Sequence, residues 1–365
     1  MRIVQLANFY APTSGGLRTA VDTLGRGYLA AGHERVLIVP GQHEEERETD
    51  EGTVVTLPGT PVGGGYRMVL RPALVARALD RIKPDSLEVS DKATFVTAGT
   101  WARDNDTGAV LFSHERLDTW LAARFLRRWQ HGAAVLEPAV QRLYRSIVKR
   151  FDTVVVTSAF AENEFARLSV PTLRRIPLGV DLDTFRPAET FDTSGPVRMV
   201  YAGRLSPEKN PKAVILAVRE LIREGIAVRL DVYGNGAALP TLRRHAAGLP
   251  VVFHGYVGDR AELARQIASA EVAFAPSAAE TFGLSVLEAL ACGTPVVAAA
   301  TGAAPELIAP GAGVAVPPTP EGLARGVVEV MCWPAAERRA AARRRAEKFP
   351  WSATTAQMLS LHARN

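Results

Sequence analysis

Short apolar runs alternate with longer stretches of helical periodicity along the whole of this 365-residue chain. Apolar runs of roughly four to eight residues between turn signals are typical of buried strands, and strands that alternate with helices indicate a parallel α/β sheet. The first half therefore predicts helices at residues 17–31 and 68–83, and strands at residues 3–7, 35–39, 53–57, 86–89, 109–112 and 152–156. The acidic stretch at residues 44–51 is predicted to form an exposed loop, and the three glycines at 63–65 a flexible turn.

The second half repeats this plan, with predicted strands at residues 197–201, 228–233, 251–253, 272–275 and 295–298. Two domains are expected, because a single hydrophobic core rarely grows past about 250–300 residues. The segment at residues 176–187, which holds Gly179 between prolines, is the candidate hinge. Ligands of such sheets bind at the carboxyl ends of the strands, so the active site is predicted in a cleft between the domains.

The net charge of +5 comes largely from two groups of arginines. Solvated helix faces explain the group at residues 338–345 best. The group at residues 124–129 mixes arginine with Phe125, Leu126 and Trp129. That mixture suits contact with anionic lipid head groups, and it equally suits an anionic acceptor. Nucleic acid is disfavoured as a partner, because the chain carries no helix-turn-helix signature and no aromatic–basic strand motif.

The cysteines and the apolar runs indicate in which cellular compartment the protein is expected. Cys292 and Cys332 give neither a disulfide framework nor metal-ligand spacing. No apolar run approaches the roughly 20 residues that span a bilayer. No signal peptide is expected, because Met1 leads directly into a strand. A cytoplasmic protein is therefore expected, with peripheral contact at the inner face of a membrane left open.

The most informative segment runs from residue 280 to residue 288, Glu-Thr-Phe-Gly-Leu-Ser-Val-Leu-Glu. A helix that begins near Leu284 places Glu288 about one turn in, at roughly 3.6 residues per turn, and leaves Glu280 in the preceding loop. The free N–H groups at the start of that helix suit a diphosphate. Carboxylates on both sides of a phosphate seat fit a nucleotide sugar, although a glutamate in a first helical turn is also common for electrostatic reasons alone.

A second motif follows the first strand of the second half. That strand runs into Gly-Arg-Leu-Ser-Pro-Glu-Lys-Asn at residues 203–210, which places Arg204 and Lys209 five residues apart on one loop. Arginine supplies a planar fork and lysine a point charge. Two such cations on one loop can converge on a diphosphate, whereas either cation alone is more often a solvated surface charge.

Together these segments resemble a retaining glycosyltransferase of family 4. The resemblance covers residues 1 to about 361 and rests on Ala202-Gly203-Arg204-Leu205 with Glu208-Lys209, Pro276-Ser277, residues 280–288, Gly15-Gly16, residues 177–181 and residues 292–298. It implies the GT-B fold, with two Rossmann-like doubly wound domains that face a central cleft. The N-terminal, acceptor-side domain would span residues 1–180 and be completed by a C-terminal helix at 351–365, and the nucleotide-sugar domain would span residues 181–350. These motifs are specific for the family, but not for the donor base, the sugar or the acceptor.

The resemblance also implies catalytic roles. Arg204 and Lys209 would stabilise the negative charge on the departing diphosphate, as preorganised electrostatic groups. Glu280 would orient the donor sugar. His114 would hydrogen-bond a sugar hydroxyl rather than act as a general base. Retention would follow from attack on the same face, with the leaving phosphate accepting the proton.

Further residues would bind the donor. Glu288 would hold the ribose, Gly15 and Gly16 would approach the diphosphate, and Phe282, Gly283 and Leu284 would offer backbone amides. The base would lie against Gly234 and the turn with Val257 and Asp259. Asp259 could accept hydrogen bonds from guanine, or it could cap a helix that starts at Arg260. On the acceptor side the resemblance gives no firm assignment for any of the candidates Arg18, Asp91, Lys92, Arg116 and Asp118.

The preferred function is transfer of a hexose, in first place mannose from GDP-mannose, to a lipid or glycan acceptor, because the chain resembles actinobacterial lipid mannosyltransferases. A UDP-glucose-dependent glucosyltransferase is the alternative, and a sugar-nucleotide epimerase is a weaker one. A nicotinamide-dependent oxidoreductase is disfavoured, since no Gly-x-Gly-x-x-Gly follows the first strand. A non-catalytic sugar-binding protein is disfavoured by the two cations and two glutamates. No cofactor and no obligatory metal are expected, because Arg204 and Lys209 would already stabilise the charge on the departing diphosphate. The motifs at residues 104–106 and 181–183 resemble metal-binding acid motifs, but they are typical of turns.

Overall fold

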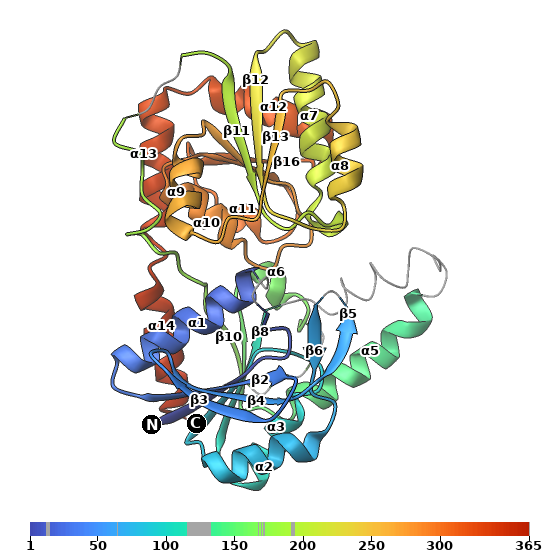
Figure 1. Cartoon of the computed structure of the whole chain (residues 1–365), viewed down its shortest axis with the longest axis vertical. Helices are drawn as coiled ribbons and strands as arrows, with labels where there is room; N and C mark the ends of the chain where they lie inside the picture. The colour runs from blue at the N-terminus through green and yellow to red at the C-terminus, as the bar shows by residue number, and fades with distance from the viewer. Residues whose placement is uncertain are drawn as a thin grey trace. The chain divides into compact units, whose positions relative to one another are not determined.

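The computed structural model describes residues 1–11, 15–63, 65–114, 133–166, 168, 170, 172–190 and 194–364. The chain forms two compact units, which we call unit 1 (Met1–Pro177 and Trp351–Asn365) and unit 2 (Leu178–Pro350). Each unit contains one large, mainly parallel sheet with helices packed against it (Figure 1). The predicted α/β fold class is thereby confirmed for both units.

The sheet of unit 1 has eight strands in the order β10-β9-β8-β7-β1-β2-β4-β3, and only β3 is antiparallel to its neighbour. The strands are β1 (Arg2–Leu6), β2 (Glu34–Gly41), β3 (Glu45–Thr49), β4 (Gly52–Pro58), β7 (Ser86–Val89), β8 (Gly108–Ser113), β9 (Thr153–Val156) and β10 (Leu173–Arg175). A separate hairpin is formed by β5 (Thr60–Gly63) and β6 (Tyr66–Met68). The helices are α1 (Gly15–Ala30), α2 (Pro72–Ile82), α3 (Thr97–Asp104), α5 (Ala133–Val148), α6 (Ala159–Glu162) and α14 (Trp351–His362).

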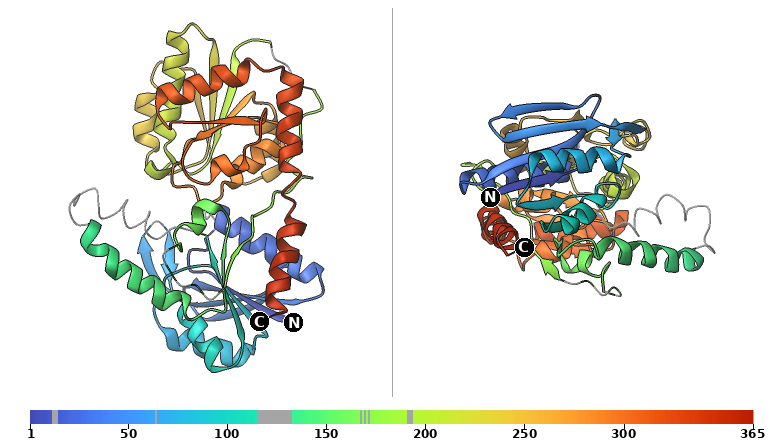
Figure 2. Two further views of the ribbon diagram at one scale, coloured as in Figure 1. Left: turned by 180° about the vertical axis from the view of Figure 1, so that it is seen from behind. Right: turned by 90° about the horizontal axis from the view of Figure 1, so that it is seen from below.

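Alternation along the strands of unit 1 divides its interior into two layers, because successive side chains point to opposite faces of a sheet. Val4 and Leu6 of β1 belong to the large apolar cluster that α2, α3 and α5 complete. Gln5 faces the other way, toward α1 and α14, where buried polar groups meet. Figure 2 shows α14 ending near the N-terminus, beside the first strand.

Helix α14 joins unit 1 through polar contacts as well as packing. The Thr354 hydroxyl donates to the Pro177 carbonyl at 2.8 Å, and His362 Nδ1 lies 2.8 Å from Ser86 Oγ. The His362 ring also packs edge-on against Tyr28 of α1. The end of the chain is thus held against the central strands of unit 1.

Two local predictions for unit 1 are wrong. The acidic stretch is not a loop, since Glu45–Thr49 forms the exposed edge strand β3 and pairs with β4 through its backbone. Charged side chains on both faces hide such a strand from pattern analysis, and they also discourage pairing with other chains. The helix predicted from residue 68 starts only at Pro72. The turn predicted at the glycines falls between β5 and β6, where Gly65 lies in a turn.

The sheet of unit 2 has six parallel strands in the order β13-β12-β11-β14-β15-β16. They are β11 (Val197–Ala202), β12 (Val228–Tyr233), β13 (Val251–Gly255), β14 (Val272–Ala275), β15 (Val296–Ala299) and β16 (Gly313–Val316). The helices are η2, a 3₁₀ turn (Pro207–Lys209), α7 (Pro211–Arg223), α8 (Leu239–His245), α9 (Arg260–Ala268), α10 (Leu284–Ala291), α11 (Ala304–Leu307), α12 (Pro320–Met331) and α13 (Ala335–Ala346). Apolar residues of α7 and α12 form one cluster with β11 and β12.

The arginines of α13 are not the solvated face that the sequence predicted. Arg338 is buried, and only Arg344 among the five is exposed. The other four donate to main-chain carbonyls in unit 2: Arg338 to Trp333, Arg339 to Ala268, Ala270 and Cys292, Arg343 to Leu182, Phe185 and Ala291, and Arg345 to Glu306 and Leu307. Several of these carbonyls lie at the ends of helices, where main-chain acceptors lack intrahelical donors. The positive charges therefore serve the packing of α13.

Within the described ranges, every helix is too short or too polar to cross a bilayer.

Candidate functional site

Three loops of unit 2 meet where β11, β12 and β13 end. The Gly203 N–H donates to the Tyr233 carbonyl at 2.9 Å, and the Gly234 N–H donates to the Gly255 carbonyl at 2.6 Å. Gly234 has φ +131°, and a Cβ there would lie 2.0 Å from the Gly203 carbonyl oxygen. No other residue fits, so Gly234 sets the close approach of these loops whatever else it contacts.

The two motifs found in the sequence come together in this part of unit 2. Lys209, at the end of η2, lies 2.6 Å from Glu280, through Nζ and Oε2. The side chains remain 32% and 22% exposed, so the pair stands at the surface and not in the core. The Ser277 hydroxyl donates to the Glu208 carbonyl at 2.9 Å and ties the two loops together beside the pair. A cation and a carboxylate are thus positioned side by side by two loops that contact each other.

Arg204 differs from Lys209 in having no partner for its side chain among the described residues. It is exposed, and its carbonyl accepts a hydrogen bond from the Tyr201 hydroxyl at 3.0 Å. That contact fixes the backbone at Arg204, while the guanidinium remains available to an incoming anion.

The loop after β14 turns into α10 as the sequence predicted, with α10 beginning at Leu284. Gly283 precedes the helix with φ +104°, a conformation that glycine adopts without strain. Phe282 is buried, so its side chain packs in the interior and only its backbone can face a ligand. The Ala303 N–H donates to the Glu280 carbonyl at 2.8 Å and so fixes the backbone of this loop at Glu280. Gly283 and Leu284 therefore present the first-turn N–H groups that intrahelical bonding leaves free.

Glu288 lies on α10 with its side chain 13% exposed. Arg260, the first residue of α9, donates to its Oε1 at 2.9 Å. Burial raises the pKa of Glu288, and the charge and hydrogen bond of Arg260 act in the opposite direction. No motif of the sequence indicates a role for Arg260, because its pairing with Glu288 depends on two helices that meet only in the folded unit.

Asp259 caps α9, which confirms the helix-cap role that the sequence offered as one of two for this residue. Its Oδ1 accepts from the N–H groups of Ala261 and Glu262 at 2.8 and 3.3 Å. Val257 is half-buried in the turn before α9. Among the described residues, hydrogen bonds reach Oδ1 alone, so Oδ2 of this exposed side chain is left to solvent.

Three predicted residues belong to unit 1. Gly15 and Gly16 do not open a loop as predicted but form the exposed start of α1. His114 follows β8, and its ring stacks on Phe112 with centroids 4.2 Å apart. Burial lowers the pKa of His114 to about 4, so the ring is neutral near pH 7 and can offer a hydrogen bond to a hydroxyl.

The acceptor candidates of unit 1 are held in internal contacts where they are described. Asp91 is buried after β7 and accepts from the Ala93 N–H at 2.8 Å, and burial raises its pKa to about 6. Lys92 is buried against Glu164. Arg18 pairs with Asp22 at 3.3 Å. Arg116 and Asp118 lie outside the described residues, as does the arginine group at 124–129.

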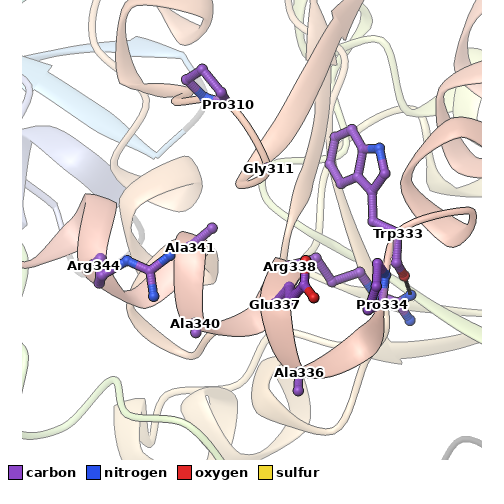
Figure 3. Close-up of a pocket in the computed structure, with 10 residues that line it drawn as sticks. All are labelled: Pro310, Gly311, Trp333, Pro334, Ala336, Glu337, Arg338, Ala340, Ala341 and Arg344. Atoms are coloured by element: carbon purple, nitrogen blue, oxygen red, sulfur yellow. Dashed lines mark hydrogen bonds between the residues drawn. The ribbon is translucent and has the colours of Figure 1, made fainter.

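One hollow on unit 2, of about 640 Å³, contains none of these residues. Figure 3 shows it between α13 and the turn at Pro310 and Gly311, with Trp333 and Arg338 among its lining. Over the described part of the chain, no three His, Cys, Asp or Glu side chains group as metal ligands.

Two family models account for most of the chain. The model described as "Glycosyltransferase Family 4" matches residues 14–184, and the model described as "Glycosyl transferases group 1" matches residues 184–349. A relative from Mycobacterium tuberculosis, GDP-mannose-dependent alpha-(1-6)-phosphatidylinositol dimannoside mannosyltransferase, is 42% identical over 99% of this chain and 95% of its own length. The chain belongs to glycosyltransferase family 4. The resemblance drawn from its motifs is thereby confirmed.

One further relative and one solved structure agree with the assignment to glycosyltransferase family 4. The GDP-mannose-dependent alpha-(1-6)-phosphatidylinositol monomannoside mannosyltransferase of Mycolicibacterium smegmatis is 33% identical over 84% of this chain and 82% of its own length. The structure of sucrose-phosphate synthase from Thermosynechococcus elongatus matches 100% of this chain and 98% of that chain, with a TM-score of 0.80 at 20% identity. The fold is therefore GT-B, and the enzyme is a hexosyltransferase.

Proposed function

We propose that this glycosyltransferase moves mannose from GDP-mannose to a phosphatidylinositol mannoside, with retention of configuration. The observation that carries the proposal is the 42% identity with a phosphatidylinositol dimannoside mannosyltransferase over nearly all of both chains. The second relative, which acts on the monomannoside, supports the same donor and the same class of acceptor.

The site in unit 2 supports a reaction that needs charge stabilisation more than proton transfer. Arg204 and Lys209 would face the diphosphate as it departs and stabilise the growing negative charge. Glu280 would exchange Lys209 for a sugar hydroxyl once the phosphate binds that lysine. Because the Lys209–Glu280 pair is partly exposed to solvent, this exchange requires no burial of an unpaired charge.

The donor base and ribose would lie against the turn before α9. The free Oδ2 of Asp259 suits the two N–H groups on the guanine edge, which supports GDP over UDP. Glu288 would accept hydrogen bonds from the ribose hydroxyls. In unit 1, His114 would contact the donor sugar, and Gly15 and Gly16 the diphosphate.

A transfer assay with purified protein tests the proposal. GDP-mannose and UDP-glucose are offered with phosphatidylinositol mono- and dimannoside, and the lipid product is analysed for its linkage and anomeric configuration. Mannose transferred from GDP-mannose in α-configuration, with strong loss in Glu288→Ala, supports the proposal. Transfer of glucose from UDP-glucose would replace it by the glucosyltransferase alternative.

We also infer peripheral contact with anionic lipid at the inner face of the membrane, since the proposed acceptor is itself a lipid. The arginine group at residues 124–129 is the candidate contact. Co-sedimentation with vesicles that contain phosphatidylinositol measures it. Binding that persists unchanged after Arg124, Arg127 and Arg128 are replaced by Gln would exclude this group.

A further inference from the structure

We propose that Arg260 is a positioning residue, which holds the carboxylate of Glu288 in place for the ribose hydroxyls of the donor. This inference rests on the proposed function, in which Glu288 binds the ribose. It adds a residue whose part in the site no motif of the sequence indicated.

The geometry joins two helices through one carboxylate. Arg260 Nη2 donates to Oε1 of Glu288 at 2.9 Å, from the first residue of α9 to the second turn of α10. Oε2 of Glu288 accepts no hydrogen bond from any residue in the described ranges. One oxygen is therefore fixed by the protein and the other is left for a hydroxyl, in an orientation that the fixed oxygen determines.

Arg260 is itself held from two sides, which an ordinary surface arginine is not. Its guanidinium carbon lies 4.9 Å from the centroid of the Phe185 ring, and Phe185 is fully buried. The Asp259 cap fixes the start of α9 directly before it. A cation over an aromatic face is attracted by the ring electrons. The arginine therefore reaches Glu288 in one preferred conformation although 43% of its side chain is exposed.

The contact matters more for recognition than for folding. An ion pair that solvent reaches adds little to stability. A carboxylate that accepts hydroxyl hydrogen bonds needs to be ionised and correctly turned, and Glu288 is buried enough to gain from a neighbouring cation on both counts. Loss of Arg260 should therefore weaken the part of the binding energy that depends on the ribose hydroxyls.

The test compares GDP with 2′,3′-dideoxy-GDP, which lacks those hydroxyls, by titration calorimetry. The proteins are wild type, Arg260→Met, Arg260→Lys, Glu288→Gln and the double variant Arg260→Met/Glu288→Gln. Arg265→Met is the matched control, because Arg265 lies on the same helix and, in the part of the chain that the structure describes, forms its ion pair with Glu262. Thermal unfolding checks that each variant is folded.

We expect wild type to prefer GDP by about tenfold or more, the worth of one or two charge-assisted hydrogen bonds. Arg260→Met should lose most of that preference by binding GDP more weakly, with little change for the dideoxy nucleotide. Arg260→Lys should be intermediate, Arg265→Met should match wild type, and the double variant should be no weaker than Glu288→Gln alone. A merely structural role would weaken both nucleotides alike.

Three outcomes would overturn the inference. An unchanged preference in Arg260→Met, with wild type discriminating normally, refutes it and leaves the proposed function standing. Tighter GDP binding in that variant would mean that Arg260 competes with the ribose. Failure of wild type to bind GDP at all would refute the proposed function and the inference together.

Discussion

The two units place their charged residues in opposite ways. In unit 2 the predicted donor residues form pairs that solvent reaches, Lys209 with Glu280 and Arg260 with Glu288. In unit 1 the central charge is Glu88, which is fully buried beneath α1 and α14. An exposed pair can exchange partners with a ligand at little cost, whereas a buried one is costly to break. The same residue types thus form a candidate binding site in unit 2 and a buried stabilising network in unit 1.

The buried network in unit 1 is a connected set of hydrogen bonds around Glu88. Glu88 accepts from Gln5 Nε2 at 2.9 Å and from the Tyr28 hydroxyl at 2.6 Å, and His362 of α14 lies 3.4 Å from it. Burial alone raises the pKa of Glu88, but the bond and charge of His362, with the bonds from Tyr28 and Gln5, hold that pKa below its ordinary value. The network fixes the last helix to the first strand.

The largest effect should come from opening the exposed pair in unit 2. Lys209→Met should lower kcat by about 100- to 1,000-fold, because it removes charge stabilisation in the transition state. Its melting temperature should stay close to that of wild type, since exposed pairs add little stability. Steady-state kinetics measure kcat, and thermal unfolding measures the melting temperature. Lys212→Met, an exposed lysine on α7, is the control, and a comparable loss there would remove the special role of Lys209.

Breaking the buried network should have the reverse signature. Glu88→Gln should lower the free energy of unfolding by about 3 kcal/mol near pH 7, because it breaks a buried charge cluster. Binding of GDP by unit 2 should change little in the folded protein. Glu45→Gln on the exposed strand β3 is the control and should be neutral.

The sign of the pH dependence follows from the lowered pKa of Glu88. The folded state then holds fewer protons than the unfolded state, so the stabilisation is complete above the ordinary glutamate pKa, about 4.3. It is lost as the pH falls through and below that value. Denaturant titrations should show the gap between wild type and Glu88→Gln shrinking below about pH 5. A gap that widens on acidification would contradict this account.

A half-buried arginine of α13, Arg339, should show that unit 2 also contains charged groups that cannot exchange partners. Arg339→Ala leaves three carbonyls without their donor and should cost about 2 kcal/mol of stability. Arg344→Ala removes an exposed arginine from the same helix and should cost almost nothing. Chemical denaturation gives the free energy of unfolding of both variants. If the two substitutions had equal effects, the arginines of α13 would form the solvated face that the sequence predicted.

The sequence predicts elements well where burial determines the pattern. The central strands of both units are buried on both faces, so they read as continuous apolar runs. The edge strand β3 was not predicted because its pairing with β4 involves only the backbone. The β5–β6 hairpin was not predicted because its strands are only four and three residues long. Composition likewise could not show that arginines of α13 serve buried carbonyls.

The candidate site divides in the same way. Arg204, Lys209, Glu280 and Glu288 were found because each stands in a short motif that local spacing defines. The Lys209–Glu280 pair and the contact of Arg260 with Glu288 were not found, because the loops and helices that carry these residues meet only in the folded unit. Gly234 was assigned to the base from the family pattern alone, whereas the structure gives it a packing role that any donor would require.

The smallest predicted effect separates the two roles of Asp259. Asn is as good a helix cap as Asp, so Asp259→Asn keeps the cap and removes the charge. A guanine N–H pair bound at Oδ2 would then meet an amide instead of a carboxylate. We expect GDP to bind about tenfold more weakly, the worth of roughly 1.4 kcal/mol, with an unchanged melting temperature.

Inosine diphosphate sharpens this experiment, because it lacks the exocyclic amine of guanine. Wild type should prefer GDP over inosine diphosphate, and Asp259→Asn should lose that preference. Asp259→Ala, which also removes the cap, should in addition lower stability by about 1 kcal/mol. If Asp259→Asn retained the full preference for guanine, the residue would act only as a helix cap. Base selection would then have to come from the backbone of the turn around Val257, whose amides and carbonyls no side-chain substitution removes.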